Sequence, residues 1–513
     1  MLAKIYSASI YGIDAYLVEV EVDLSLGLRS FVIVGLPDNA VKEAQHRVTT
    51  AIKNSGFKLP TRRITVNLAP ADIKKEGAIF DLPIAIGLLR ALGVFNSNIL
   101  DRFLLVGELS LDGTLKPIKG TISMAMATRN YGFSGIILPK ENAKEGALVS
   151  GVNVYPAEHL IDVVGFLSGS KTIEPMKVNL EEIFNLASEN LVDFSEVKGQ
   201  EHAKRALEVA AAGGHNILMI GPPGTGKTML ARRLATILPK MELEEALEAT
   251  KIHSVAGTLA PSQPIIATRP FRSPHHSISE AGLIGGGAYP KPGEVSLAHN
   301  GVLFLDELPE FHRDVLESLR QPLEDGFVTI GRAKQTITYP ARFMLAASMN
   351  PCPCGYFSDP HRECSCTIWM IKKYRSRISG PLLDRIDVHI EVPSIRYEAL
   401  AQKEAGESSE AIRDRVNRAR EIQIKRFREI NKRQPIYCNS QMSSREIRLF
   451  CEIDKTSEEL LKRAIEHFGF SARSYDRILK VARTIADLAE SPKITSEHIA
   501  EAIQYRNFDR RLI

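Results

Sequence analysis

The chain has 513 residues, 44% of them hydrophobic and 25% charged, so it is too long for one hydrophobic core and should form about two to four domains. Lysine and arginine number 65 against 61 acidic residues, and this net charge of +4 excludes a protein that holds polyanions by its overall field. Six cysteines in so long a chain exclude a disulfide scaffold, and no apolar run reaches the roughly 18 residues of a membrane span. We therefore expect a cytoplasmic protein that does not bind a membrane.

Residues 1–165 are predicted to form a mixed α/β domain. Strand-like alternation, as in residues 15–22, is combined with apolar helical segments, as in residues 81–89. The following stretch, 166–192, contains Ser168-Gly169-Ser170 and Glu174-Pro175, a composition typical of a linker.

This first domain resembles a protease domain without its nucleophile. Residues 107–113 and 137–142 resemble the proteolytic domain of Lon, which implies a ribosomal S5 domain 2-like fold. Lon carries a serine and a lysine, but residues 76–81 lack a serine and residues 117–122 have isoleucine at the apparent lysine position. We therefore expect no proteolysis and interpret the domain as a structural collar that contacts DNA.

The most specific motif of the chain has the G-x-x-x-x-G-K-[ST] spacing of a phosphate-binding loop. It follows an apolar strand, 216–220, and continues into a helical segment, 229–234. Glycines let backbone amides approach phosphates, while Lys227 reaches the β- and γ-phosphates and the Thr228 hydroxyl ligates Mg²⁺. The alternative, a glycine turn, leaves the buried lysine unexplained. The expected ATP-binding residues are Gly221, Pro222, Pro223, Gly224, Thr225, Gly226, Lys227 and Thr228.

Two further apolar strands are followed by polar residues suited to ATP hydrolysis. The strand 301–305 leads into Asp306, which would hold the Mg²⁺ shell, and Glu307, which would polarise the attacking water. The alternative for Asp306 is a helix cap. The strand 342–348 leads to Asn350, which would orient that water, the alternative being an Asn-Pro turn.

Two arginines in the last third of the chain are candidates for contacting the γ-phosphate. Arg385 lies between Asp384 and Asp387 at a predicted helix-to-strand junction. An arginine finger there would stabilise transition-state charge in a neighbouring subunit, whereas a local ion pair with either aspartate is the alternative. Arg473, in the last helical region, would reach the γ-phosphate from a lid.

Together with Val197-Lys198-Gly199-Gln200, these motifs stand in the order seen in AAA+ ATPases, which implies that Val197 also contacts the nucleotide. The tract 293–301 resembles the branch that holds magnesium-chelatase ATPase subunits and replicative MCM helicases. Over its whole length the chain resembles the YifB/ComM family of magnesium-chelatase-like proteins. This resemblance implies a hexameric, DNA-dependent ATPase with helicase or branch-migration activity, linked to recombination during natural transformation.

The expected fold is therefore α/β, with three parts after the Lon-like domain and linker. Residues 193–393 would form the AAA+ P-loop core, with a helix-2 insert, a pre-sensor hairpin and a cysteine cluster. Residues 394–440 read as a charged helical connector, and residues 441–513 as a C-terminal α-helical lid of amphipathic helices, including 474–483.

Four of the six cysteines, Cys352, Cys354, Cys364 and Cys366, lie within fifteen residues. Four thiolates can close a tetrahedral Zn²⁺ site and fold a loop that is too polar to fold alone. The C-x-C spacing is less specific than C-x₂-C, and His361 is close enough to compete as a ligand. The alternative is a loop of packed, reduced cysteines.

Two segments are candidates for DNA contacts. The segment 268–276 lacks regular periodicity and contains Arg269, Phe271 and Arg272, which could grip phosphates and stack a base. The predicted hairpin 327–338 carries Arg332 and Lys334 near its turn; hairpin tips are usually solvated, but in the resembling helicases a hairpin here projects into the pore.

Two other functions compete with an ATP-driven DNA motor. A magnesium-chelatase-type motor subunit would remodel a partner protein, but the D-x-S-x-S metal motif of chelatase partners fails here at the last position of the string 23–27. A nucleotide-gated adaptor without turnover is disfavoured because the expected hydrolytic residues are all present.

Overall fold

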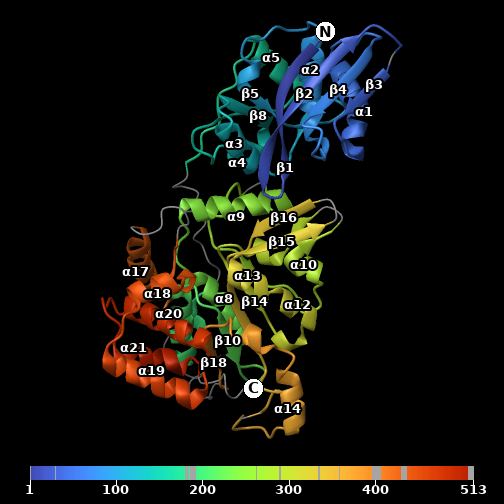
Figure 1. The fold of residues 1–513 in the computed structure, drawn as a ribbon. Coiled ribbons are helices and arrows are strands. Elements are labelled where there is room, and N and C mark those ends of the chain that lie inside the picture. The colour runs from blue at the N-terminus through green and yellow to red at the C-terminus, as the bar shows by residue number, and fades with distance from the viewer. Residues whose placement is uncertain are drawn as a thin grey trace. The chain divides into compact units, whose positions relative to one another are not determined.

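The computed structural model describes residues 2–28, 30–179, 184, 192–260, 263–287, 290–332, 335–357, 359–394, 406–428 and 436–506. The chain divides into two compact units, each with its own sheet (Figure 1). The amino-terminal unit comprises residues 1–187 and 243–267, and the carboxy-terminal unit comprises residues 188–242 and 268–513. Among the described helices, none combines the length and apolar character that a bilayer crossing requires.

The amino-terminal unit is built on a mixed seven-stranded sheet with the order β3-β4-β2-β1-β5-β8-β9. The predicted strand 15–22 is confirmed as part of β2, where every second residue from Val18 to Leu24 is buried. This alternation places one face of the strand on the core. The strands are β1 (Leu2–Tyr11), β2 (Asp14–Ser25), β3 (Ser30–Val34), β4 (Arg63–Ala69), β5 (Phe103–Leu105), β8 (Gly135–Pro139) and β9 (Asn153–Ala157), and β6 (Glu108–Leu109) pairs separately with β7 (Leu115–Lys116).

Helices of this unit cover the sheet. The predicted helix 81–89 is confirmed as α2, in which every residue except Arg90 is buried. The unit extends into the segment predicted as a linker, because α5 ends at Ser168 and the N–H of Met176 donates to the carbonyl of Val154 at 2.8 Å. The helices are α1 (Asn39–Asn54), α2 (Asp81–Ala91), α3 (Thr121–Asn130), α4 (Ala143–Gly146) and α5 (Leu160–Ser168).

A further helix of this unit, α9 (Leu243–Ala256), comes from the middle of the range expected for the ATPase core. The hydroxyl of Ser254 accepts a hydrogen bond from the N–H of Gly120 at 2.9 Å and donates one to the carboxylate of Glu145. Burial raises the pKa of Glu145, so the bond to Ser254 satisfies a costly buried carboxyl group. Lys251 of the same helix forms an ion pair with Asp14. The segment 243–267 is therefore an insertion that folds with the amino-terminal domain.

The carboxy-terminal unit is built on a five-stranded parallel sheet with the order β11-β14-β17-β10-β18. All residues of β10, β14 and β17 are buried, which explains why these strands are continuous apolar runs in the sequence. The strands are β10 (Ile217–Ile220), β11 (Phe271–Arg272), β14 (Val302–Leu305), β17 (Met344–Met349) and β18 (Val388–Glu391), and β12 (Gly285–Gly286) pairs separately with β13 (Lys291–Pro292).

The lid helices gather on the β18 side of this sheet, whereas α10, α12 and the β15–β16 hairpin lie on the β14 side (Figure 1). Helices before and within the core are α7 (Glu201–Gly213), α8 (Lys227–Ile237), α10 (Glu280–Ile284), α11 (Glu294–Leu297), α12 (Arg313–Ser318), α13 (Arg320–Asp325), α14 (Ile368–Arg375) and α15 (Gly380–Leu383). The later helices are α17 (Ser409–Arg428), α18 (Ser444–Phe450), α19 (Lys455–Phe468), α20 (Ala472–Leu488) and α21 (Ser496–Gln504).

The predicted hairpin is also present. Strands β15 (Phe327–Arg332) and β16 (Gln335–Pro340) pair antiparallel, from Phe327 opposite Pro340 to Arg332 opposite Gln335. Lys334 and the side chain of Arg332 lie outside the described residues.

Candidate active site

The phosphate-binding loop connects β10 to α8, as the sequence predicts. Gly224 and Gly226 have φ angles of +78° and +85°, a conformation that favours glycine. Gly221 is required for a different reason, since a Cβ atom there would overlap the carbonyl oxygen of Val392, just after β18. The backbone therefore has the glycine-dependent path that close contact with phosphates needs.

Lys227, the first residue of α8, points back into this loop. Its buried ammonium group donates to the carbonyls of Gly221 at 2.7 Å and Pro222 at 2.8 Å, and to Oδ1 of Asn350 at 3.3 Å. Burial lowers the pKa of Lys227 to about 8, against the opposing attraction of Asp306 and of Glu307. The structure thus brings Asn350 and the loop lysine together, from two neighbouring strands.

Thr228 and Asp306 meet where Mg²⁺ would be held. The Thr228 hydroxyl donates to Oδ2 of Asp306 at 2.6 Å, so one hydroxyl and one carboxylate oxygen face each other beside the phosphate loop. Hydroxyl and carboxylate oxygens are ligands that Mg²⁺ prefers, so these residues fit the ion. Ser348 is a buried residue of β17, and its hydroxyl donates to the other carboxylate oxygen of Asp306, Oδ1.

Sequence reasoning did not select Ser348. Its only signal is a polar residue within a buried strand, two positions before Asn350. Because Ser348 occupies one oxygen of Asp306, it orients the carboxylate so that the other oxygen faces Thr228.

Glu307 follows Asp306 in a left-handed conformation, with a φ angle of +54°. Its N–H donates to Oδ1 of Asp306 at 3.1 Å, and its side chain is 55% exposed. The short 3₁₀ helix Leu308–Glu310 begins after Glu307 without a side-chain cap, so a helix cap does not explain Asp306. Nδ1 of His276 lies 3.8 Å from the Glu307 carboxylate, a neighbour that the sequence did not reveal.

Arg385 and Arg473 lie together, at the carboxylate of Glu324 in α13. Arg385 is buried, donates to the carbonyl of Pro381 at 2.7 Å and forms an ion pair with Oε2 of Glu324, while Arg473 donates to Oε1 at 3.2 Å. The hydrogen bond from Arg385 lowers the pKa of Glu324, which keeps this carboxylate charged. In the described part of the chain, neither arginine bonds to the phosphate loop.

The expected alternative for Arg385, an ion pair with Asp384 or Asp387, is not what the structure shows. Asp387 instead pairs with Arg477, and His215 Nδ1 lies 3.5 Å from it. Arg385 pairs with Glu324, which is distant in sequence, so the residues next to Arg385 do not indicate this ion pair.

The motif 197–200 lies beside the phosphate loop. The side-chain amide of Gln200 donates to the carbonyl of Thr225 at 2.8 Å. Val197 is fully buried in the hydrophobic core with Phe194 and α7, so its contact with a nucleotide stays a prediction.

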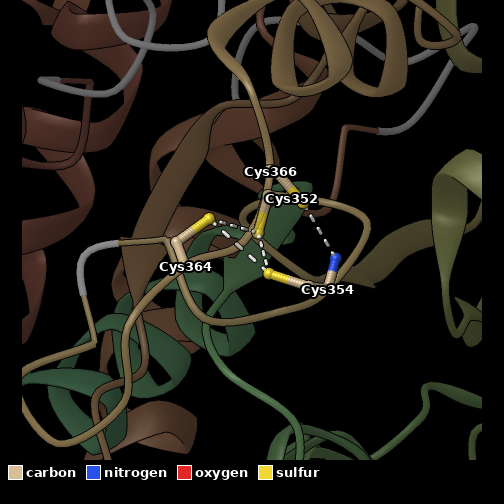
Figure 2. A group of neighbouring side chains, drawn as sticks. All are labelled: Cys352, Cys354, Cys364 and Cys366. Atoms are coloured by element: carbon tan, nitrogen blue, oxygen red, sulfur yellow. Dashed lines mark hydrogen bonds between the residues drawn. The ribbon is translucent and has the colours of Figure 1, made fainter.

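The four cysteines of residues 352–366 converge, with their sulfur atoms turned toward one another (Figure 2). Their ligand atoms all lie within 4.8 Å, and the Sγ atoms of Cys352, Cys354 and Cys364 are separated by 3.3 to 3.7 Å. Cys366 Sγ accepts the N–H of Cys354 at 3.4 Å. Of the residues described, only these four form such a metal-ligand group, and His361 does not belong to it.

The candidate DNA residues before β14 are engaged within the protein. Phe271 and Arg272 form β11, so the expected irregular loop is wrong for them, and Phe271 stacks on Phe304 with ring centroids 6.0 Å apart. Arg272 forms a two-pronged ion pair with Glu294 at 2.7 and 2.8 Å. Arg269 donates to three backbone carbonyls, those of Pro239, Lys240 and Asn300. Phe271 is partly buried and packs on Phe304, so base stacking by this ring stays a prediction.

A parallel sheet of this order, with the phosphate loop after β10 and the polar residues after β14 and β17, defines a P-loop ATPase core of the AAA+ class. Family models match each part: "Magnesium chelatase, subunit ChlI" over residues 193–400, "Subunit ChlI of Mg-chelatase" over residues 20–142, and "Magnesium chelatase, subunit ChlI C-terminal" over residues 406–506.

Similar proteins extend over the whole chain. "Competence protein ComM" of Haemophilus influenzae is 46% identical over 514 residues, which cover 100% of this chain and 98% of that protein. "Uncharacterized protein YifB" of Escherichia coli is 46% identical over 513 residues, with the same coverage. Lon protease 2 of Bacillus subtilis is 34% identical over 146 residues, 27% of this chain and 26% of that protease. The chain belongs to the YifB/ComM family of magnesium-chelatase-like AAA+ proteins.

Proposed function

We propose that this protein is an ATP-driven DNA motor of the helicase or branch-migration type, acting in recombination during natural transformation. The observation that carries the proposal is the assembled hydrolytic site: Lys227, Asn350, Thr228 and Asp306 are joined by hydrogen bonds at the ends of three adjacent strands. Such a site would bind ATP and Mg²⁺, and Glu307, the residue after Asp306, would polarise the attacking water. The name of the Haemophilus relative supports the link to competence.

A ring of identical subunits is the second part of the proposal. Arg385 and Arg473 share Glu324 rather than contacting their own phosphate loop, so they would supply their charge to the site of a neighbouring subunit. An open cavity of about 540 Å³ beside Arg385, lined by Glu280, Glu317 and Glu324 among others, leaves room for part of that neighbour. By the family resemblance we expect six subunits.

DNA is proposed as the track on which the ring moves. The hairpin of β15 and β16 presents an end that carries Arg332 and Lys334 in its sequence, and cations there would contact the phosphate backbone without reading bases. A role for Arg269 or Arg272 would require them to leave the partners described above. The Lon-like domain is proposed as a non-proteolytic collar.

We further propose that Cys352, Cys354, Cys364 and Cys366 hold one structural Zn²⁺. Four sulfur ligands within 4.8 Å of one another match the number and softness of donors in closed zinc sites. The backbone N–H of Tyr356 lowers the pKa of Cys354 to about 6, which favours the thiolate form that binds metal. Burial raises the pKa of Cys364 to about 12, so this thiolate would need the charge of the bound ion. The bound ion would stabilise the folded loop, as a hydrophobic core does in a larger domain.

The competing function is a magnesium-chelatase-type motor that remodels a partner protein, which the names of the three matching family models favour. The two functions differ in what stimulates ATP turnover. We expect single-stranded, duplex or branched DNA to raise the ATPase rate, and the purified protein to displace a DNA strand only with ATP. A Glu307→Gln variant should bind ATP and DNA but lose turnover by orders of magnitude. A rate that no DNA changes, with no strand displacement, would contradict the DNA motor.

A further inference from the structure

We propose that the metal held by the cysteine cluster controls nucleotide binding, because the loop that it closes supports the phosphate-binding loop directly. The inference rests on the zinc site proposed above and extends it from a local brace to a regulatory site, whose ligand is a divalent cation that prefers thiolates. Two contacts carry the proposal. One joins the metal loop to Pro223 of the phosphate loop, and the other passes through Asn350, the hydrogen-bond partner of Lys227.

The first contact joins the turn between the cysteines to the phosphate loop. Gly355 follows Cys354 with a φ angle of +87°, and its N–H donates to the carbonyl of Cys352 at 3.0 Å. A Cβ atom at Gly355 would lie 2.6 Å from Cδ and 2.7 Å from Cγ of Pro223. The backbone of the metal loop thus packs against a proline of the phosphate loop so closely that no side chain fits between them.

The second contact passes through Asn350. This residue lies two positions before Cys352, and its amide oxygen accepts the hydrogen bond from Lys227 at 3.3 Å. Since β17 fixes the chain up to Met349, the conformation of Asn350 depends on the loop that follows it. A loop closed by a metal at Cys352 therefore also fixes the partner of the lysine that binds the β- and γ-phosphates.

The far side of the loop is fixed independently of the metal. Arg375 of α14 donates from Nε to the carbonyl of Pro351 at 3.1 Å, and its guanidinium lies 5.3 Å from the ring centroid of Phe357. The N–H of Phe357 in turn donates to Cys352 Sγ at 3.3 Å. These contacts tie α14 to the first cysteine, so the region should stay folded when the metal is lost, while the turn at Gly355 loosens.

Without metal, four thiol groups at these separations have no common partner, and the turn that carries Gly355 loses its closure. Pro223 then loses its support. The chain after Asn350 is then held by Arg375 and no longer by the metal, so the hydrogen bond between Asn350 and Lys227 weakens. We expect nucleotide affinity to fall by about tenfold, the equivalent of one hydrogen bond to a charged group. Because binding couplings are reciprocal, bound nucleotide should strengthen zinc binding by the same factor.

The test uses the full-length protein and a fluorescent ADP analogue. Zinc content is measured by elemental analysis, zinc is removed with a chromogenic zinc chelator in excess Mg²⁺, and the nucleotide Kd is measured before removal, after removal and after zinc is returned. The expected result is one zinc per chain, with a Kd that rises about tenfold on removal and recovers with zinc. Zinc should also leave more slowly when ADP is bound.

The variant Gly355→Ala tests the contact with Pro223 without changing any of the metal ligands. Gly355→Ala keeps all four cysteines but places a methyl group on Pro223, so it should raise the Kd while zinc content stays at one per chain. Gly469→Ala is the matched control, since Gly469 also has a positive φ angle, +70°, with nothing within 4 Å of its added Cβ. An unchanged Kd both in zinc-free protein and in Gly355→Ala would overturn the coupling and leave the zinc site intact. Protein that never binds zinc would overturn the zinc proposal itself.

Discussion

Arg385 and Arg473 donate to opposite oxygens of one carboxylate, that of Glu324, although one follows the short helix α15 and the other begins the lid helix α20. Arg385 is buried and also held by the carbonyl of Pro381, whereas Arg473 is 58% exposed. Both guanidinium groups bond to this one carboxylate, so Glu324 sets the direction in which Arg385 and Arg473 point. In the proposed ring, this pair would donate to phosphate oxygens bound by a neighbouring subunit.

We expect Glu324→Ala to lower ATP turnover by about tenfold, because both arginines lose the group that orients them. The triple variant Glu324→Ala/Arg385→Ala/Arg473→Ala should be no slower than the double variant Arg385→Ala/Arg473→Ala, since the carboxylate would act through the two arginines. Turnover under saturating ATP measures this. Asp325→Ala is the control: it removes a neighbouring carboxylate of the same cavity, and in the described structure Asp325 holds neither arginine. A faster Glu324→Ala enzyme would mean that the carboxylate sequesters the arginines.

Subunits that lack Arg385 should be rescued by subunits that lack Lys227. Each single variant, Arg385→Ala or Lys227→Ala, should be nearly inactive alone. When the two are mixed under conditions that allow subunit exchange, some interfaces combine an intact phosphate loop with an intact arginine, and ATPase activity should reappear. The mixing ratio should set the recovered rate. If no mixture exceeds the sum of its components, Arg385 does not act across an interface.

Nucleotide affinity should depend on pH through Lys227. Burial lowers its pKa in the nucleotide-free protein to about 8, and the bound phosphates need the charged form. Affinity should therefore be nearly constant below pH 7.5 and fall as pH rises through 8, approaching about tenfold per pH unit at higher pH. Measurements of Kd from pH 7 to 9.5 test this. Lys227→Arg, whose guanidinium stays charged, should lose this dependence, whatever its affinity at pH 7.

The sequence predicts which residues meet beside the phosphate loop, because local patterns determine their positions. Buried strands such as β10 and β17 read as apolar runs, and the residues that follow them must meet at one edge of a parallel sheet. The hydrogen bonds of Thr228 to Asp306 and of Lys227 to Asn350 follow from that topology. The converging cysteines likewise follow from their short spacing.

Contacts between distant segments could not be predicted in this way. Neither Glu324 nor Ser348 belongs to a motif, yet one orients two arginines and the other orients Asp306. Phe271 is an aromatic residue in a polar segment, a pattern that suggests base stacking, but the sequence does not reveal that its ring stacks on Phe304. The sequence of helix α9 has no pattern that assigns it to either domain. Its contacts with Gly120, Glu145 and Asp14 show that it belongs to the amino-terminal unit.

His276 should restrain the catalytic carboxylate. Its Nδ1 lies 3.8 Å from the Glu307 carboxylate, and its ring contacts Phe311 edge-on. A contact of Glu307 with His276 would compete with the proposed contact of Glu307 with the attacking water. We expect His276→Gln to raise the ATPase rate without DNA by about two- to fivefold, the effect of removing one weak, exposed contact between side chains. His275→Gln is the matched control, because His275 stacks on His276 and binds the Ser277 hydroxyl rather than Glu307. Steady-state turnover of both variants, with and without DNA, shows whether His276 restrains Glu307 or holds it in its productive position. A rise confined to His276→Gln supports restraint, whereas a fall would mean that His276 holds Glu307 in its productive position.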